Sequence, residues 1–337
     1  MKKKRSIYDV ANELQVSVTT LSFVLNGKGQ EKRISKEVIH KIETYIKEIG
    51  YQPNHLGRSL STGKSKTIGM IVGDINNPFF SEVASGIEKI ALQAGYTLIV
   101  ASSNNELNQM KSVIKLLNDR NVDGFIISPI TGIEDTIADL RSDNRPMVIF
   151  NCHFPELDTF NVVVDNKQGA FEATRHLYEN GFRNIGFITL DLYSQNERIE
   201  GYSSFIESRH LNKHILKLPY KLDYEQITHE ITQFLTTNQE LDSVFFSTNF
   251  LTLSGLKALS HLDGKYAKMG IVSFDDHLLY DVLNPGITAI KQPVKQISST
   301  IIHHLLNMMD TSDDKRTEPQ TIVFPVDLIV RTSSFRR

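Results

Sequence analysis

The first fifty residues place their hydrophobic positions with the period of amphipathic helices. In the last of three predicted helices, at residues 35–50, apolar side chains recur every three or four positions, at Val38, Ile39, Ile42, Tyr45, Ile46 and Ile49. A short helix is predicted to begin at Ser6, which forms a capping-box pattern with Asp9. The middle helix runs from Val18 to Asn26, behind Ser17 as its N-cap. A very short turn joins the first two helices, which is the spacing of a helix-turn-helix.

From Thr67 onward, continuous apolar runs alternate with amphipathic helices. The runs are candidate strands at 67–72, 97–101, 124–128, 147–150, 185–190, 243–247 and 269–274. Such runs are typical of parallel strands that helices cover on both faces. One helix is predicted to begin at Asn77 as its cap, with Pro78 in the first position. Others are predicted near 106–120, 166–180, 195–209, 223–237, 249–261 and 294–309.

The predicted fold class is therefore α/β, with a small all-α helix-turn-helix headpiece followed by two doubly wound α/β lobes. About 270 residues of alternating elements exceed one typical domain, which is why two lobes are expected. In such folds a ligand cleft lies at the carboxyl ends of the parallel strands. The polar stretch 61–66 is the predicted linker between headpiece and lobes.

The charge distribution separates the same two parts of the chain. The 337 residues carry a formal net charge of −2, but residues 1–60 hold 11 Lys and Arg against 6 Asp and Glu. The remainder holds 26 against 33. A basic head on an acidic body suggests a polyanionic partner for the head alone, although a solvated basic tail would give the same balance.

The sequence lacks the motifs of several other protein classes. The apparent phosphate loop between Gly57 and Ser65 has the wrong glycine spacing and follows no strand. His210 and His214 lack an acidic partner, and Cys152 has no placed base. We therefore expect no enzyme, no catalytic residue, no metal and no cofactor. No apolar run reaches the ~18 residues of a membrane helix, and no signal peptide follows the basic start, so we expect a cytoplasmic protein without a membrane partner.

Short polar side chains gather at the start of the middle predicted helix. They are Ser17, Thr19, Thr20 and Ser22. Leu21 and Leu25 are the predicted core anchors of the same helix. A DNA-reading helix enters the major groove with its N-terminus, where such side chains reach bases and phosphates. An amphipathic core helix with a serine cap would show the same pattern, so the segment favours DNA binding without requiring it.

A set of ordered motifs runs along the whole chain. They are Ile7-Tyr-Asp-Val-Ala11, Val16-Ser-Val-Thr-Thr-Leu-Ser22, Val24-Leu-Asn-Gly27, Ile49-Gly-Tyr-Gln-Pro-Asn54, Gly57-Arg-Ser-Leu60, Thr67-Ile-Gly, Asn76-Asn-Pro-Phe-Phe80, Glu197-Arg-Ile-Glu-Gly-Tyr202, Ser273-Phe-Asp275 and Gln292-Pro293. Any one fragment is weakly specific, whereas the ordered set is highly specific. The set resembles the LacI/GalR family of bacterial transcription regulators.

The resemblance implies a headpiece at 1–53 that binds DNA, a hinge and linker at 54–65 that order on DNA, and a body at 66–337 that is similar to periplasmic sugar-binding proteins. The first lobe would take about 66–164 and 293–320, and the second about 165–292 and 321–335. It implies a sequence-specific regulator at the bacterial nucleoid, a repressor of carbohydrate-utilisation genes. Its partners would be a pseudo-palindromic double-stranded DNA operator and a small-molecule effector in the inter-lobe cleft. No leucine heptad follows the last strand, so we expect a homodimer rather than a tetramer.

The resemblance also implies which headpiece residues contact DNA. The residues that would position the headpiece on the DNA backbone are Ser17, Thr20, Ser22 and Asn26, with Tyr8 also facing DNA. Val18 and Thr19 would lie where the family reads base edges. This arrangement agrees with the polar helix start described above.

Three further DNA positions follow from the same resemblance. Asn54 would contact DNA in the hinge, and Leu60 matches a leucine that wedges into a central minor-groove step. Inserting such a wedge unstacks and bends the site at a cost of a few kcal/mol. Phe23 stands where the family commonly has Arg. It can only stack or touch a thymine methyl on DNA, or pack against a neighbouring protomer or the body.

Eight residues match effector-contact positions of the family. They are Asn77, Phe79, Phe80, Asn151, Arg198, Asn249, Asp275 and Gln292. Phenylalanine faces suit the C–H faces of a sugar ring, and an Asp and an Arg give charge-assisted hydrogen bonds to vicinal hydroxyls. Two departures remove charge from the site: Asn151-Cys152 replaces an Asp-Arg pair, and Phe250 stands where Asp is usual. A sugar is the implied effector, with a purine or a sugar phosphate left open. A sugar-binding protein without a DNA role is the remaining alternative.

Overall fold

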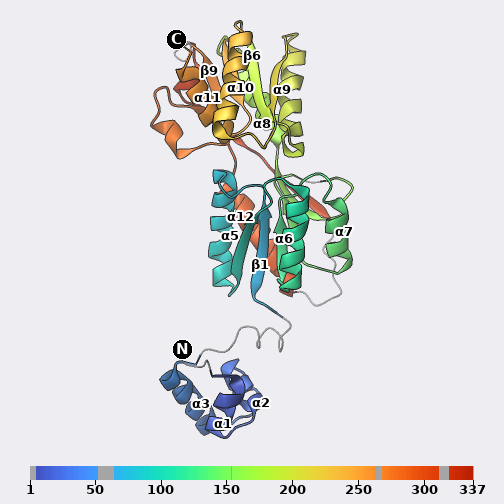
Figure 1. Ribbon diagram of the computed structural model, residues 1–337, viewed down its shortest axis with the longest axis vertical. Coiled ribbons are helices and arrows are strands. Elements are labelled where there is room, and N and C mark those ends of the chain that lie inside the picture. Colours follow the sequence, from blue (N-terminus) through green and yellow to red (C-terminus); the bar gives the residue numbers. More distant parts are fainter. Residues whose placement is uncertain are drawn as a thin grey trace. The chain divides into compact units, whose positions relative to one another are not determined.

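The structure is a computed structural model that describes residues 5–51, 64–152, 154–262, 264, 268–310 and 319–336. Its internal contacts divide the chain into two units, Met1–Lys66 and Thr67–Arg337, each of which is described by itself (Figure 1). Asn54 and Leu60 lie outside the described residues. Within the described ranges, no helix has the length and apolar character needed to cross a membrane.

The first unit is a bundle of three helices, α1 (Ile7–Leu14), α2 (Val18–Leu25) and α3 (Lys36–Ile49), as predicted. Ser6 and Asp9 form the predicted capping box, because each side chain bonds the backbone N–H of the other residue. The core residues are Val10, Ala11, Leu14, Leu21, Val24 and Ile42. Leu21 is fully buried, but the second predicted anchor, Leu25, is only partly buried. Val24, three residues after Leu21, is buried in the core instead.

The first lobe of the second unit is built on a parallel sheet. Its strand order is β11 (Gln320–Phe324), β5 (Phe160–Val164), β4 (Met147–Phe150), β3 (Gly124–Ile127), β1 (Thr67–Val72) and β2 (Thr97–Ser102). Helices α5 (Pro78–Gln93) and α12 (Val294–Asp310) pack against one face. Helices α6 (Leu107–Asp119) and α7 (Glu134–Ser142) cover the other face, so the strands are buried on both sides.

The second lobe repeats this plan. Its strand order is β12 (Asp327–Ile329), β10 (Thr288–Lys291), β9 (Gly270–Phe274), β8 (Ser243–Phe246), β6 (Ile185–Leu190) and β7 (His214–Leu218). All neighbouring strands are parallel except β12, which runs antiparallel to β10. Helices α8 (Asn166–Glu179) and α9 (Asn196–Ser208) pack on one face. Helices α10 (Tyr224–Thr237) and α11 (Asn249–Ser260) pack on the other.

The chain passes between the lobes three times. The passages lead from β5 into α8, from β10 into α12, and from β11 into β12. All of these strands stand at one end of the two strand orders, so this end of the molecule acts as the hinge edge. The last passage follows Phe324, four residues after the boundary expected near residue 320, because β11 completes the first-lobe sheet beside β5.

The predicted strands and helices are present with shifts of one or two residues at their ends. The sequence analysis did not predict helix α7 or the strands β5, β7, β10, β11 and β12. These strands are three to five residues long, and several carry polar residues such as Asn161 and Lys217. Their pairing with longer neighbours stabilises them, which a local hydrophobic pattern does not reveal.

Candidate functional site

The exposed N-terminus of α2 carries the predicted DNA contacts. Ser17 caps the helix: its Oγ accepts the backbone N–H of Thr20 at 3.0 Å and lies 2.8 Å from Thr20 Oγ1. Thr19 is exposed, and Val18 is half-buried. The short side chains are thus oriented by the helix cap, while Leu21 and Val24 fix the opposite face in the core.

Two further predicted contacts lie elsewhere on the headpiece, at the end of α2 and on α1. Asn26 ends α2, and its Nδ2 donates to the carbonyl oxygen of Ser22 at 2.9 Å. Tyr8 on α1 is 67% exposed, so its ring is available to a partner. The structure therefore leaves Tyr8, Ser17 and Thr19 on the surface of the headpiece.

Phe23 is half-buried within the headpiece rather than fully presented to solvent. The ammonium group of Lys32 lies 5.7 Å from the centre of its ring. A cation at this distance is attracted by the negative face of an aromatic ring. The sequence analysis left open a contact of Phe23 with DNA, with a neighbouring protomer or with the body. The contact with Lys32 is a further one, and it lies within the headpiece itself.

The first-lobe residues of the expected effector site are mostly engaged by their own lobe. Asn77 caps α5, and its Oδ1 accepts the N–H of Phe79 at 3.0 Å. Phe79 and Phe80 are buried, and the ring of Phe80 meets that of Phe150 edge-on at 6.0 Å. Asn151 has a φ of 74°, and its Nδ2 donates to Ser128 Oγ at 3.1 Å. The first-lobe residues would therefore present a ligand mainly with aromatic rings and with amides that are already hydrogen-bonded within the lobe.

Cys152 follows Asn151 and is partly buried. Its thiol donates to the carbonyl oxygen of Pro129 at 3.4 Å. Burial raises the pKa of Cys152 to about 12. Because the thiolate is the nucleophile, a thiol that stays protonated at neutral pH is chemically inert.

The second lobe supplies a buried charged group, Arg198 on α9. Its Nε donates to Asn166 Oδ1 at 2.8 Å, and its Nη1 donates to the carbonyl oxygen of Ser247 at 2.5 Å. The guanidinium carbon lies 3.6 Å from the ring centre of Phe274, and Nη1 lies 3.6 Å from Asp275 Oδ2. Burial lowers the pKa of Arg198, while Asp275 counteracts this shift. The arginine is therefore fixed in position on several sides.

Asp275 and Gln292 complete this group. Asp275 follows β9 with a φ of 69°, and its Oδ1 accepts a hydrogen bond from Gln292 Nε2 at 2.5 Å. Both residues are buried. Asn249 is also buried, in the first turn of α11. Arg198, Asn249, Asp275 and Gln292 thus all follow strands of one sheet at their carboxyl ends, as predicted.

Three buried polar atoms in segments that follow strands of this sheet have no hydrogen-bond partner among the described residues. They are Gln195 Oε1, Ser247 Oγ and Asn249 Oδ1. Leaving a buried acceptor unpaired costs about 1–3 kcal/mol, so such atoms indicate where a ligand or water binds. The sequence analysis identified Asn249 but missed Gln195 and Ser247. The available signal was their position: Ser247 directly follows β8, and Gln195 lies in the connection between β6 and α9.

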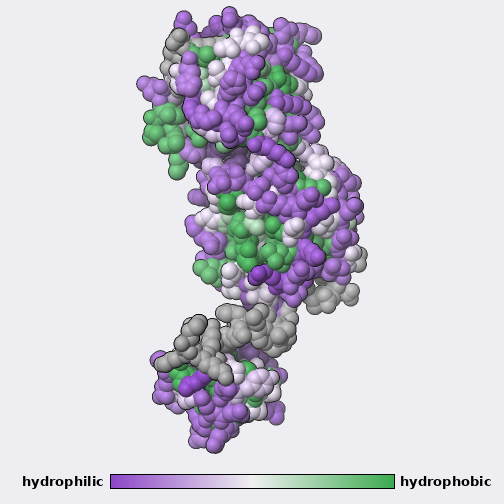
Figure 2. All heavy atoms as spheres, viewed as in Figure 1, coloured by the Kyte–Doolittle hydropathy of each residue, from purple (hydrophilic) through white to green (hydrophobic). Residues whose placement is uncertain are grey.

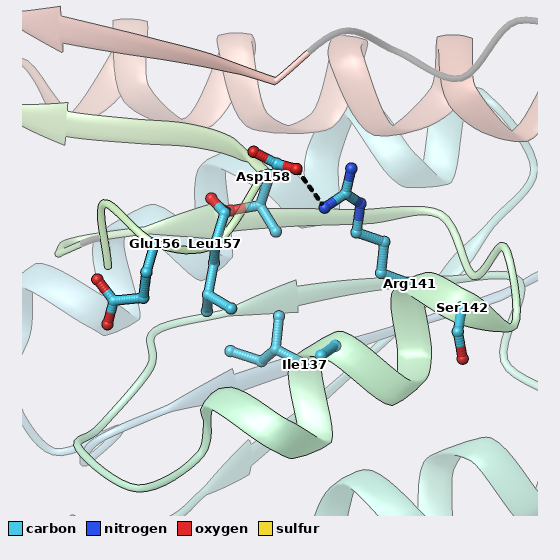
Figure 3. A pocket seen from close by; sticks show the side chains of 8 residues that line it. Ile137, Arg141, Ser142, Glu156, Leu157 and Asp158 are labelled. Carbon is cyan, nitrogen blue, oxygen red and sulfur yellow. Dashed lines mark hydrogen bonds and ion pairs between the residues drawn. The ribbon is translucent and has the colours of Figure 1, made fainter.

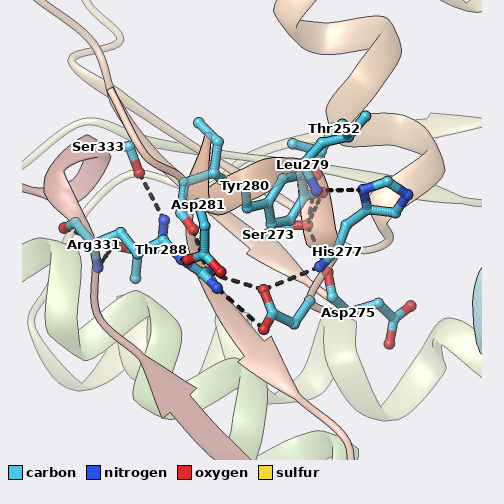
Figure 4. A network of polar contacts seen from close by, with 12 residues as sticks. Thr252, Ser273, Asp275, His277, Leu279, Tyr280, Asp281, Thr288, Arg331 and Ser333 are labelled. Carbon is cyan, nitrogen blue, oxygen red and sulfur yellow. Dashed lines mark hydrogen bonds and ion pairs between the residues drawn. The ribbon is translucent and has the colours of Figure 1, made fainter. Parts of the chain in front are cut away.

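A polar network holds the loop after β9 in place (Figure 4). Ser273 Oγ lies 2.7 Å from Thr252 Oγ1 and 3.0 Å from Tyr280 Oη, and Arg331 bonds Asp276 at 2.9 Å. Burial raises the pKa of Tyr280 to about 12. Ser273 Oγ also lies 3.3 Å from the backbone carbonyl oxygen of Asp275, so the network contacts the backbone of Asp275.

A separate hollow lies on the outside of the first lobe, between α7 and residues 156–159 (Figure 3). Its volume is about 320 Å³, and the ion pair of Arg141 and Asp158, at 2.9 Å, borders it. None of the predicted effector residues lines this hollow. Across the described ranges, no group of three potential metal-ligating side chains comes together.

Comparison with known proteins agrees with this architecture. Residues 6–54 match the model of bacterial regulatory proteins of the lacI family, and residues 65–332 match the model of periplasmic binding proteins and the sugar binding domain of the LacI family. The ribose operon repressor of Halalkalibacterium halodurans is 30% identical over 334 residues, which cover 98% of this chain and 97% of the relative. The sucrose operon repressor of Pediococcus pentosaceus is 30% identical over 331 residues, covering 97% and 98%.

Solved structures show the same fold. A lac repressor dimer bound to operator and the anti-inducer ONPF superposes with a TM-score of 0.84 at 19% identity, over 99% of this chain and 100% of that one. A periplasmic binding protein/LacI transcriptional regulator from Alkaliphilus metalliredigens, complexed with D-xylulofuranose, gives 0.69 at 25% identity, over 80% and 98%. With a helix-turn-helix headpiece, two α/β lobes and both family models matched, the chain belongs to the LacI family of bacterial transcription regulators.

Proposed function

We propose that this protein represses genes of carbohydrate use by binding a pseudo-palindromic operator as a homodimer, and that a neutral sugar between its lobes changes its affinity for the operator. The observation that carries the effector part is the buried Arg198–Asp275 pair beside three unpartnered buried oxygens. Hydroxyl groups of a sugar would donate to those oxygens. The protein would act in the bacterial cytoplasm, where its DNA partner lies.

The charges around Arg198 favour a neutral effector over a phosphorylated one. Arg198 is already paired with Asp275, and the carboxylate of Glu197 lies near enough to raise the pKa of Arg198. The carboxylates of Asp275 and Glu197 already outnumber the single positive charge of Arg198. A phosphate group would add further negative charge there. The regulator from Alkaliphilus metalliredigens binds D-xylulofuranose, an uncharged sugar, which agrees with this preference.

For DNA binding, we assign phosphate positioning to Ser17, Thr20, Ser22 and Asn26, and base reading to Val18 and Thr19, with Tyr8 also facing DNA. The exposed, capped start of α2 supports these roles because polar side chains at a helix N-terminus suit the major groove. An exposed apolar cluster on the second lobe, Leu278, Leu279 and Val282, supports contact with a second copy (Figure 2). Large exposed apolar groups of this kind mark protein interfaces more often than free surface.

The test of the DNA function uses an operator selected by the full-length protein from random duplexes, with affinity measured by fluorescence anisotropy. We expect a steep fall in affinity with rising salt, because lysines and arginines release counterions from DNA. Replacing Leu60 with Ala should weaken operator binding at least tenfold, whereas Thr237→Ala, at an exposed polar position at the end of α10, should change nothing. No preference for any duplex would contradict the regulator, and unchanged affinity in Leu60→Ala would contradict the hinge wedge alone.

The effector part is tested separately by thermal shift of the full-length protein with neutral sugars, sugar phosphates and purines. A ligand that binds only the folded state raises the melting temperature. We expect a neutral sugar to do so and to change operator affinity in the anisotropy assay. A shift with a purine or sugar phosphate alone would overturn the neutral-sugar assignment and leave the DNA function intact.

A further inference from the structure

The two lobes contact each other at the edge opposite to their hinge. The three chain passages leave strands at one end of the two sheets, whereas β2 and β7 are the edge strands at the other end. Glu106 follows β2 and Lys221 follows β7, and their Oε1 and Nζ atoms lie 2.8 Å apart. This ion pair therefore connects the two lobes at the edge where no chain passage joins them.

Tyr220 makes a second and more buried contact at the same edge. Its hydroxyl is hydrogen-bonded with Asp74 and Asn105, which follow β1 and β2 of the first lobe. Burial and the charge of Asp74 raise the pKa of Tyr220 to about 12. A Cβ at Gly73 would lie 3.1 Å from the Asn105 amide, so the glycine leaves room for the side chain of Asn105. We call the contact of Tyr220 and Lys221 with the first lobe the free-edge latch.

An aromatic pair joins the lobes on another side. Phe154, in the connection between β4 and β5, stacks on Tyr193, which begins the short helix η1 (Tyr193–Gln195) after β6. The ring centres are 4.7 Å apart and the planes are inclined by 22°. Phe154 is buried in the core beneath α6 and α7, and Tyr193 leads into α9. The pair therefore closes the boundary on the face that carries α7 and α9.

Both contacts border the candidate effector residues. Asp74 stands three residues before Asn77, and Tyr193 stands two residues before Gln195, whose side-chain oxygen is unpartnered. A chain segment spans at most ~3.3–3.6 Å per residue, so the backbone of Asp74 lies within about 11 Å of that of Asn77, and the backbone of Tyr193 lies within about 7 Å of that of Gln195. The free-edge latch and the aromatic pair therefore both involve residues that are close neighbours of candidate effector residues.

We propose that the free-edge latch and the Phe154–Tyr193 pair determine the size of the effector and limit it to a single sugar ring. The proposal rests on the neutral-sugar effector proposed above. A second ring would have to displace a hydrogen-bonded tyrosine or separate two stacked aromatic rings, and either change loses contacts that the closed lobes make.

The first experiment is a thermal-shift comparison of the full-length protein with single-ring and two-ring sugars. D-ribose, D-xylulose, D-glucose and D-fructose form one arm, and sucrose and cellobiose form the other. We expect a shift with a member of the first arm and none with the second. A shift with a disaccharide overturns the size limit and leaves the sugar effector intact, whereas no shift in either arm overturns the sugar effector and the size limit with it.

The second experiment opens the site. In Tyr220→Ala and Tyr193→Ala we expect sucrose or cellobiose to bind, while the Kd of the single-ring sugar rises about threefold to tenfold. Tyr220→Phe is the matched variant: it keeps the ring but loses the hydrogen bonds, so it should raise that Kd about threefold and still exclude disaccharides. If both alanine variants fold and still exclude disaccharides, the two contacts do not set the size of the effector.

The contribution of the Glu106–Lys221 ion pair can be tested by exchanging the two charges. Lys221→Glu should raise the Kd of the single-ring sugar about twofold to fivefold, and the double variant Glu106→Lys, Lys221→Glu should restore it. Lys217→Ala, on the exposed face of β7, is the control and should have no effect. A double variant that behaves as the sum of its single changes contradicts the inter-lobe contact.

Discussion

The two lobes use the polar groups of the proposed effector site in different ways. In the first lobe, Asn77 bonds its own helix and Asn151 bonds Ser128, so their amides are already satisfied. In the second lobe, Ser247 and Asn249 keep buried oxygens without a partner among the described residues. The comparison indicates that the first lobe contributes shape and apolar surface, whereas the second lobe contributes hydrogen-bond selectivity.

The largest expected effect comes from removing the charge that organises the second-lobe wall. Arg198→Met should lower the free energy of unfolding by about 3–5 kcal/mol, because it leaves buried Asp275 without its cation. It should also abolish the effector response of the operator complex. Urea denaturation and anisotropy of the full-length protein measure the two effects. An Arg198→Met protein that is as stable as the parent would show that the pair does not organise this wall.

Phe80→Ala tests whether the first-lobe wall acts by packing. We expect a loss of about 3 kcal/mol in unfolding free energy, since the ring is buried against Phe150. Phe80→Leu, which keeps most of the volume, should cost less than half as much. A smaller loss in Phe80→Ala than in Phe80→Leu would contradict the packing role of this residue.

Ser247→Ala removes an unpartnered oxygen from the second-lobe wall. Stability should stay within about 0.5 kcal/mol, because no protein hydrogen bond to Oγ is lost. The Kd of the effector should rise about tenfold, as expected for one lost hydrogen bond to a ligand. Ser260→Ala, at an exposed serine at the end of α11, is the matched control and should leave the Kd unchanged. Equal affinity in both variants would remove Ser247 from the site.

Asn77→Ala is expected to give the smallest effect. In contrast to Ser247→Ala, substitution of this residue should change stability more than effector affinity. Loss of the helix cap should lower the unfolding free energy by about 1 kcal/mol, while Asn77→Ser, which also caps helices, should retain most of it. If the first-lobe wall acts mainly through shape, the Kd of the effector should change less than twofold in Asn77→Ser. A tenfold change there would show that the amide itself contacts the effector.

The helix boundaries and caps could be predicted because they depend on near neighbours in the chain. The Ser6–Asp9 capping box, the Ser17 cap and the Asn77–Pro78 start all join residues two to three positions apart. The short strands β10, β11 and β12 could not be predicted in this way. Their stability comes from partners far away in the sequence, such as β5 for β11.

The sequence by itself determined the helix-turn-helix, the alternation of strands and helices, and the residue types at the effector positions. Only the tertiary structure decided that Phe23 lies beneath Lys32, that the buried oxygens of Gln195 and Ser247 have no partner among the described residues, and that Tyr220 reaches the first lobe. The physical reason is the range of the interactions: local hydrogen bonds and hydrophobic periodicity are written into neighbouring residues, whereas burial and inter-lobe contacts depend on how distant segments pack.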